Sequence, residues 1–243
     1  KDTIRKSGTQ HSQTVGLNLK KQHMKISNYS LKARYFPAII NTIPFIIIGL
    51  SITNQHLKNL FENLLGIKII SEISISLIII YAIAQLQRIF SKEIFENAIF
   101  KNGLNFPTTL YLLYTDDTYS LDYKQKIREK IFSDFNIQLP NERVQIDDSK
   151  SAYQKIAEAV SLVRRKVGNG TLTLQHNIEY GFIRNLVGGS ILGLIGTFAI
   201  LILNRINLVN DSANIIAWVL MLIYTLILIF RKVLLKRYAR LYA

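Results

Sequence analysis

The fold is decided by residues 181–203, which read GFIRNLVGGSILGLIGTFAILIL. The first part of this segment is polar and carries a charge, whereas residues 187–203 carry none. As a helix, that uncharged part would be about 26 Å long, and the hydrocarbon core of a membrane is about 30 Å thick. The segment is therefore expected to cross a membrane.

Three further segments have the same character. Apolar residues fill them almost throughout instead of recurring on one helical face, which is typical of transmembrane helices. We predict a mainly α, polytopic membrane protein in which two transmembrane hairpins bracket a small, mostly helical domain. The hairpins are expected at 28–86 (spans at about 36–53 and 69–86) and at 187–243 (spans at about 187–203 and 213–230, then a basic tail). The domain and a stalk helix occupy 87–186, and residues 1–27 form a polar arm, disordered or artificial in origin.

The positive charge lies beside the predicted spans. The net charge is +14, and residues 231–243 carry five Lys or Arg and no acid. Residues 1–35 carry eight Lys or Arg and one acid, whereas the middle domain is nearly neutral. This distribution is typical of positive-inside topology and of attraction to anionic lipid. We expect both termini and the domain to be cytoplasmic, membrane lipids to be partners, and no direct nucleic-acid binding.

The middle region has weaker signals. A helix is expected to continue past Arg88 as a stalk. Residues 102–114 favour a short strand, with a one-turn helix as the alternative. One helix should follow Ser120 or Asp122 and end near Phe135, and another should follow Asp148 or Ser149 and end near residue 166.

No constellation of residues predicts an enzyme. The chain has no cysteine, and its four histidines are isolated. Phosphate-binding glycine loops are absent from the sequence. The pairs Asp116-Asp117 and Asp147-Asp148 precede predicted helices, where carboxylates cap the positive end. We therefore predict no catalytic residues, no metal site and no cofactor.

Several residues inside the spans are candidates for packing or motion. Pro44 should kink the first span and crowd the Ile40 carbonyl, and Asn41 and Thr42 are placed to satisfy freed carbonyls. The kink is either a gating hinge or an ordinary bend. Small residues that allow close helix approach, within a hairpin or between subunits, recur in the third span at Gly189, Gly193 and Gly196.

Two polar residues in the first hairpin form a candidate intramembrane polar site. Glu72 lies near the outer end of the second predicted span, and Asn41 lies in the first. Polar and acidic side chains are costly in lipid and mark ion pathways. Glu72 also lies within one turn of the boundary, where it can reach water.

The stretch HNIEYGFIRN at 176–185 comes directly before the third span. One interpretation is an interfacial anchor, with aromatic rings at the head groups and an arginine at phosphate. The other is an element that couples the domain to the membrane helices. The residues assigned to it are Asn177, Glu179, Tyr180, Gly181, Phe182, Arg184 and Asn185.

Scattered residues resemble a group of uncharacterised bacterial membrane proteins with a hairpin–domain–hairpin layout. They are YSLKARY at 29–35, PTT at 107–109, Asn177, YGF at 180–182 and RN at 184–185. Some members of that group lie in antiphage defence loci. The resemblance implies a bacterial inner (cytoplasmic) membrane and a defence role, and it implies no catalytic residues.

The predicted function is that of a non-enzymatic inner-membrane component. The cytoplasmic domain would bind a partner protein or a signal, and the membrane helices would form a homo-oligomer. The alternative is a small ion channel or transporter, which Glu72, Asn41 and Pro44 motivate.

Overall fold

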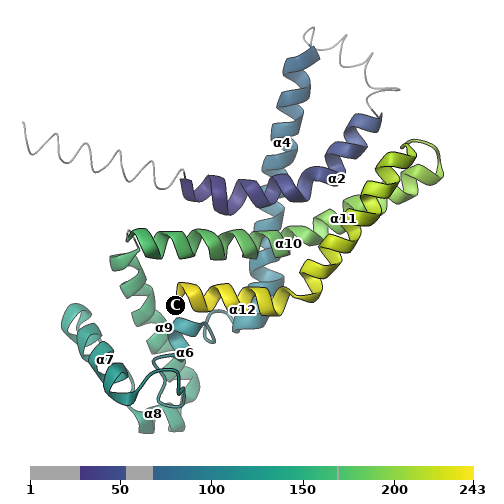
Figure 1. Ribbon diagram of the computed structural model, residues 1–243. Coiled ribbons are helices and arrows are strands. Elements are labelled where there is room, and N and C mark those ends of the chain that lie inside the picture. The colour runs from purple at the N-terminus through teal and green to yellow at the C-terminus, as the bar shows by residue number, and fades with distance from the viewer. Residues whose placement is uncertain (1–27, 53–67, 169) are drawn as a thin grey trace, which may run out of the picture.

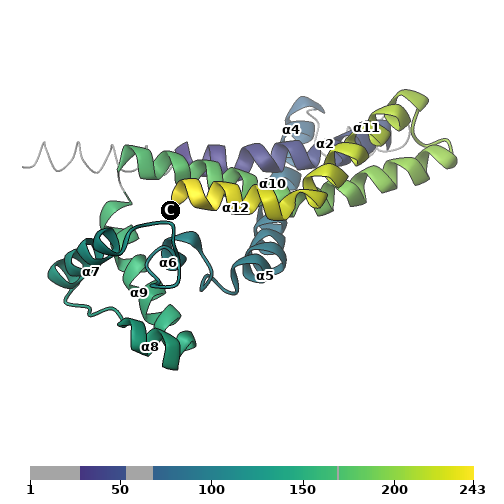
Figure 2. The same cartoon turned by 60° about the horizontal axis from the view of Figure 1, so that its bottom comes forward.

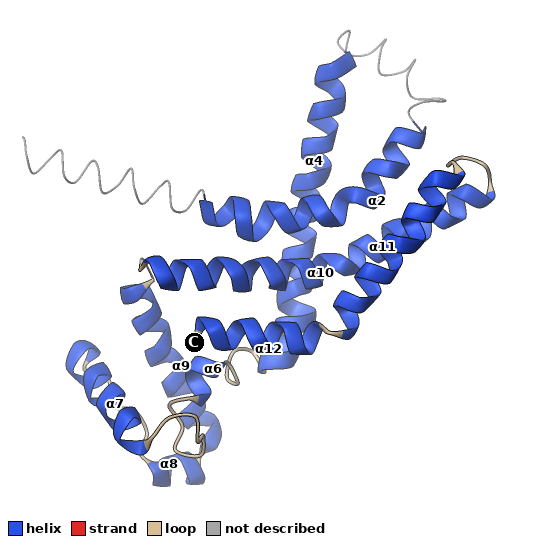
Figure 3. Cartoon of the chain, viewed as in Figure 1, coloured by secondary structure: helices blue, strands red, loops and turns tan. Residues whose placement is uncertain are grey.

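The structure is a computed structural model that describes residues 28–52, 68–168 and 170–243. These residues are mainly helical and contain no strand (Figure 3). Two segments, η1 and η3, have π-helical hydrogen bonding. The elements are η1 (Leu31–Tyr35), α2 (Phe36–Ile52), α4 (Lys68–Ile89), η3 (Phe90–Glu96), α5 (Asn97–Phe100), α6 (Pro107–Leu110), α7 (Leu121–Phe135), α8 (Glu142–Asp147), α9 (Ser149–Val167), α10 (Thr171–Arg205), α11 (Asp211–Ile229) and α12 (Arg231–Tyr242).

Three helices in the described part of the chain are long and apolar enough to cross a membrane. They are Asn28–Ser51, Thr171–Arg205 and Asp211–Ile229. The predicted span at 69–86 falls within α4, which is not one of the three. Helix α4 crosses α2 and α10 instead of running beside them (Figure 1). A membrane protein is thus indicated, whereas four spans in two hairpins stay a prediction.

Helix α10 is the centre of the molecule. It contacts α2, α4, α11, α12 and both π-helical segments. Its 35 residues make it about 52 Å long, which exceeds a hydrocarbon core of about 30 Å. The polar stretch at 176–185 therefore belongs to the same helix as the apolar span.

The predicted continuation of the helix past Arg88 is confirmed, because α4 continues through η3 and α5 to Phe100. The predicted strand at 102–114 is wrong, and its alternative, the one-turn helix, is present as α6. Phe106 is extended and Pro107 occupies the first turn, where its ring favours a helix start. The carbonyl of Pro107 then accepts from the Tyr111 amide at 2.9 Å, so the backbone bonds locally.

Helices α7 and α9 begin and end close to where the sequence predicts. Ser120 caps α7 by accepting from the Tyr123 amide at 3.3 Å. Asp148 caps α9 by accepting from the Ser151 amide at 3.1 Å. Both helices pack on a small apolar core that contains Leu112, Leu113, Ile131, Leu139, Ile156, Ala159 and Val160.

Two buried cations of α7 hold the irregular segments of this domain. Lys124 donates to the carbonyls of Leu113, at 2.8 Å, and Asp116. Arg128 donates to the carbonyls of Pro140 and Leu112 at 2.8 and 3.0 Å. Loop carbonyls without helical partners are satisfied in this way. Figure 2 shows the resulting unit of α7, α8 and α9 on one side of α10 and α12.

Candidate functional site

Three aromatic rings from distant parts of the chain meet at the first half of α10. Phe106 precedes α6, Tyr180 belongs to α10, and Tyr242 ends α12. The rings of Phe106 and Tyr180 meet edge-on with centroids 5.5 Å apart, and those of Tyr180 and Tyr242 stack at 6.1 Å. Tyr180 is only 4% exposed. It is therefore enclosed by protein and does not serve as an aromatic anchor at lipid head groups.

Arg164, near the end of α9, joins the domain to these rings. Its guanidinium carbon lies 4.6 Å from the ring centre of Phe106 and 5.1 Å from that of Tyr242. The same group donates to the hydroxyl of Thr108. Burial lowers the pKa of Arg164 from its ordinary value, with nearby tyrosines and Glu96 opposing the shift. Arginine side chains remain protonated in proteins, so the contact is a cation on two aromatic faces, worth about 0.5–2 kcal/mol.

Arg184 extends the cluster to the stalk. It pairs with Glu96 of η3 at 2.9 Å, and both side chains are mostly shielded from solvent. Its guanidinium also lies 5.8 Å from the ring centre of Tyr180. We define the junction cluster as Glu96, Phe106, Arg164, Tyr180, Arg184 and Tyr242.

The other residues assigned to 176–185 divide into two groups. A methyl group on Gly181 would lie 3.1 Å from the Ala33 side chain, and Asn185 donates to the Ala33 carbonyl at 2.6 Å. These two residues therefore hold η1 against α10. Glu179 accepts from Gln175 and faces His176 on its own helix. Asn177 and Phe182 are half-buried on α10 outside the junction cluster.

The glycines of α10 face other helices of the same chain. A methyl group on Gly193 would lie 2.6 Å from the Tyr224 ring of α11. One on Gly196 would lie 2.7 Å from Pro44 of α2. The side chains of Asn41 and Gln87 lie against Gly189, and that of Ser91 lies against Gly188, so a methyl group at either glycine would overlap them. The sequence left open whether these small residues allow close approach within a hairpin or between subunits. In the structure, they contact other helices of the same chain.

Pro44 lies inside α2, whose ribbon bends along its length (Figure 1). A proline has no amide hydrogen, so the Ile40 carbonyl four residues earlier loses its helical donor. The hydroxyl of Tyr224 donates to this carbonyl at 2.7 Å. The expectation that Asn41 and Thr42 satisfy it is wrong, because Asn41 bonds Gln87 and Thr42 donates to the Ala38 carbonyl.

Asn41 takes part in a buried polar layer between α2 and α4. Its amide donates to Gln87 at 3.2 Å, and Gln87 donates to the Arg34 carbonyl at 2.8 Å. Asn41 and Gln87 are both fully buried. The side chain of Glu72 lies outside the part of the chain that the structure describes, so a shared site of Glu72 and Asn41 stays a prediction.

Several contributors to these contacts have no local sequence signal. Glu96, Arg164 and Tyr242 are separated from Tyr180 by tens of residues, and no spacing rule connects them. Gly188 could have been found from the sequence, because it is adjacent to Gly189 in the same span. Tyr224 had a weaker signal: its hydroxyl lies within an apolar span and therefore needs a hydrogen-bond acceptor.

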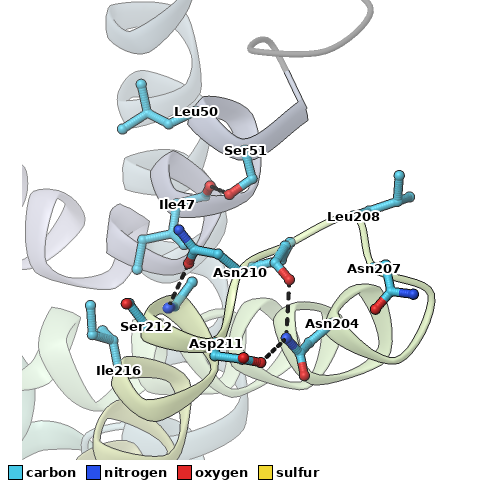
Figure 4. A pocket seen from close by; sticks show the side chains of 12 residues that line it. Ile47, Leu50, Ser51, Asn204, Asn207, Leu208, Asn210, Asp211, Ser212 and Ile216 are labelled. Atoms are coloured by element: carbon cyan, nitrogen blue, oxygen red, sulfur yellow. Dashed lines mark hydrogen bonds between the residues drawn. The ribbon is translucent and has the colours of Figure 1, made fainter.

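A groove of about 680 Å³ lies at the far end of the membrane helices. Figure 4 shows Asn204 in the last turn of α10 and Asn210 directly before α11, with Ile47, Leu50 and Ser51 of α2 across the groove. Asn204 donates to the Val209 carbonyl, and Asn210 caps α11 by accepting from the Ala213 amide. These amides stabilise the turn itself.

The described residues contain no cluster of three or more His, Cys, Asp or Glu suited to a metal ion. Comparisons with protein-family models, curated proteins and solved structures find no match.

The Tyr224 hydrogen bond generates a test by double-mutant cycle. Tyr224→Phe should destabilise the chain by about 0.5–2 kcal/mol, because a buried carbonyl loses its donor. In a Pro44→Ala background residue 44 regains an amide hydrogen, so the same change should cost less. Unfolding in detergent by denaturant measures both. Equal costs in the two backgrounds would contradict the assigned role of Tyr224.

The glycine contacts generate a second test. Gly193→Ala should cost about 1–3 kcal/mol, because the added methyl overlaps the Tyr224 ring. Gly49→Ala is the matched control, since a methyl group there has no atom within 4 Å. It should leave stability unchanged or raise it, because alanine favours a helix. The midpoint temperature of thermal unfolding should therefore fall in Gly193→Ala and stay unchanged or rise in Gly49→Ala. Equal shifts of the midpoint in the two variants would exclude close packing at Gly193.

Proposed function

We propose that this chain is a non-enzymatic component of a bacterial inner membrane that couples a cytoplasmic helical domain to its membrane helices. The observation that carries this proposal is the junction cluster. Arg164 and Phe106 come from the domain side, whereas Tyr180 belongs to α10, which continues into the membrane part, and Tyr242 belongs to α12, which follows α11. A partner or signal that moves α9 would act on α10 through these contacts.

The continuity of α10 supports transmission of that movement. Tyr180 and Arg184 of the junction cluster and the glycines that contact other helices all belong to one uninterrupted helix, α10. Helices α2, α4 and α11 all rest on this helix through side chains that leave no room for a methyl group at the glycines. Because packed interiors are not continuously deformable, a displacement at residues 180–184 would change contacts at 188–196.

The alternative of a channel or transporter has less support within a single chain. Asn41 and Gln87 are bonded to each other and fully buried, so they connect α2 to α4. Interhelical polar contacts of this kind stabilise membrane bundles. A channel built from several copies would need polar residues on the outer surface, where α10 and α11 expose Ile195, Phe198, Ile202, Trp218 and Leu222.

We further propose that the chain forms a homo-oligomer and binds a cytoplasmic protein partner. The domain exposes Tyr119, Leu121 and Tyr123 on one edge, and exposed aromatic residues are typical of protein interfaces. Mass measurement of the complex captured from bacteria in mild detergent tests both statements. Several copies together with an additional protein are expected. A mass of one copy alone would contradict both.

The coupling proposal is tested by replacing Arg164. Arg164→Ala should free the domain from the rings of Phe106 and Tyr242, whereas Arg165→Ala removes an exposed neighbour of the same charge. Because the chain has no cysteine, spin labels can be attached only at Lys126→Cys and Ser212→Cys. The distribution of distances between them should broaden in Arg164→Ala and stay narrow in Arg165→Ala.

The same pair of variants gives a cellular readout. On the resemblance to proteins of antiphage loci, we propose that the coupled chain alters the membrane during infection. Membrane potential and plaque formation should depend on Arg164 and not on Arg165, at equal amounts of inserted protein. Identical behaviour of both variants in the distance and cellular measurements would overturn the coupling proposal.

A further inference from the structure

The helix that ends the chain has two different faces. Leu235 and Ala239 are fully buried, and they pack in the apolar cluster that also contains Val187 and Tyr180 of α10. Tyr242 continues this face and stacks on Tyr180. These positions are four and three residues apart, as expected for one face of a helix. One side of α12 is therefore committed to α10.

The opposite side of α12 carries uncompensated positive charge. Lys232, Lys236 and Arg240 are spaced by four residues and are exposed, and Arg237 lies beside them. Lys232, Lys236 and Arg237 make no hydrogen bond or ion pair within the described part of the chain. Residues 231–243 contain no acid that could neutralise them.

The position of α12 places these cations near the membrane boundary. Helix α11 ends at Ile229 and α12 begins at Arg231, so one residue separates the span from the basic helix. The chain turns between the two helices (Figures 1 and 2), and α12 packs beside α10 instead of continuing along the axis of α11. Its 12 residues extend for about 18 Å.

We propose that the exposed face of α12 is a docking surface for the head groups of anionic phospholipids. Juxtamembrane clusters of Lys and Arg are attracted to anionic leaflets over about one Debye length. Val233 and Leu241 are also exposed on α12, and apolar side chains between cations are typical of helices at a lipid interface. The buried face holds Tyr242 against Tyr180, so lipid docking also orients one wall of the junction cluster.

This inference rests on the proposed membrane location and does not require coupling to the domain. The test uses full-length chain in vesicles of phosphatidylcholine alone or with phosphatidylglycerol added. A fluorophore at Leu241→Cys reports on α12, and one at Leu222→Cys, exposed on α11, reports on insertion. Quenching by lipids that carry a spin label on the head group measures contact at Leu241→Cys. Quenching by acyl-chain labels measures insertion at Leu222→Cys.

Phosphatidylglycerol should raise head-group quenching at Leu241→Cys by about twofold or more. High salt should remove the increase, because the Debye length falls from about 8 Å at physiological strength to about 3 Å at 1 M. Lys232→Gln, Lys236→Gln and Arg237→Gln together should also remove it. The control variant changes Lys126, Lys150 and Lys155 to Gln, which removes the same amount of charge from exposed sites on the domain. In this variant phosphatidylglycerol should still increase the quenching at Leu241→Cys.

The outcomes separate the two proposals. Equal quenching at Leu241→Cys in both lipids, with Leu222→Cys quenched by acyl-chain labels, would overturn lipid docking and leave the membrane location standing. Loss of quenching at Leu222→Cys would overturn the membrane location itself. The lipid and salt comparisons use the chain with its cationic face unsubstituted. They therefore test lipid docking even where the triple variant folds poorly.

Discussion

The close approach of other helices to the glycines of α10 is the constraint on which the arrangement depends. Without a side chain at Gly188, Gly189, Gly193 and Gly196, α10 accepts side chains from α2, α4, η3 and α11 directly against its backbone. In lipid there is no hydrophobic force between apolar helices, so van der Waals contact and hydrogen bonds decide which helices associate. The glycine positions therefore select the neighbours of α10.

The carbonyl that Pro44 leaves without a helical donor in α2 forms a hydrogen bond to another helix. The missing amide hydrogen leaves the Ile40 carbonyl without a helical donor, and an unsatisfied carbonyl is costly in a membrane interior. Tyr224 satisfies it, and the same ring rests on Gly193. A single tyrosine thus connects α2, α10 and α11, and the proline acts as a point of attachment in the packed state.

The junction cluster differs in character from these contacts. It combines a cation on aromatic faces with an ion pair, and all its members lie beside the first half of α10. The contrast between a closely packed, glycine-rich half of α10 and a polar, aromatic half underlies the proposal that the domain acts on the membrane helices at this place.

The sequence by itself determined the helical class, three helices that are long and apolar enough to cross a membrane, the proline within α2 and the caps of α7 and α9. These follow from local rules: uncharged runs of sufficient length, a proline without an amide hydrogen, and short polar residues before helices. It also directed attention to Tyr180, Gly181 and Arg184. Only the tertiary structure decided that Glu96 pairs with Arg184, that Arg164 lies on Phe106 and Tyr242, and that Tyr224 satisfies Ile40. These partners are far apart in the chain, and their meeting depends on how whole helices pack around α10, which no local pattern encodes.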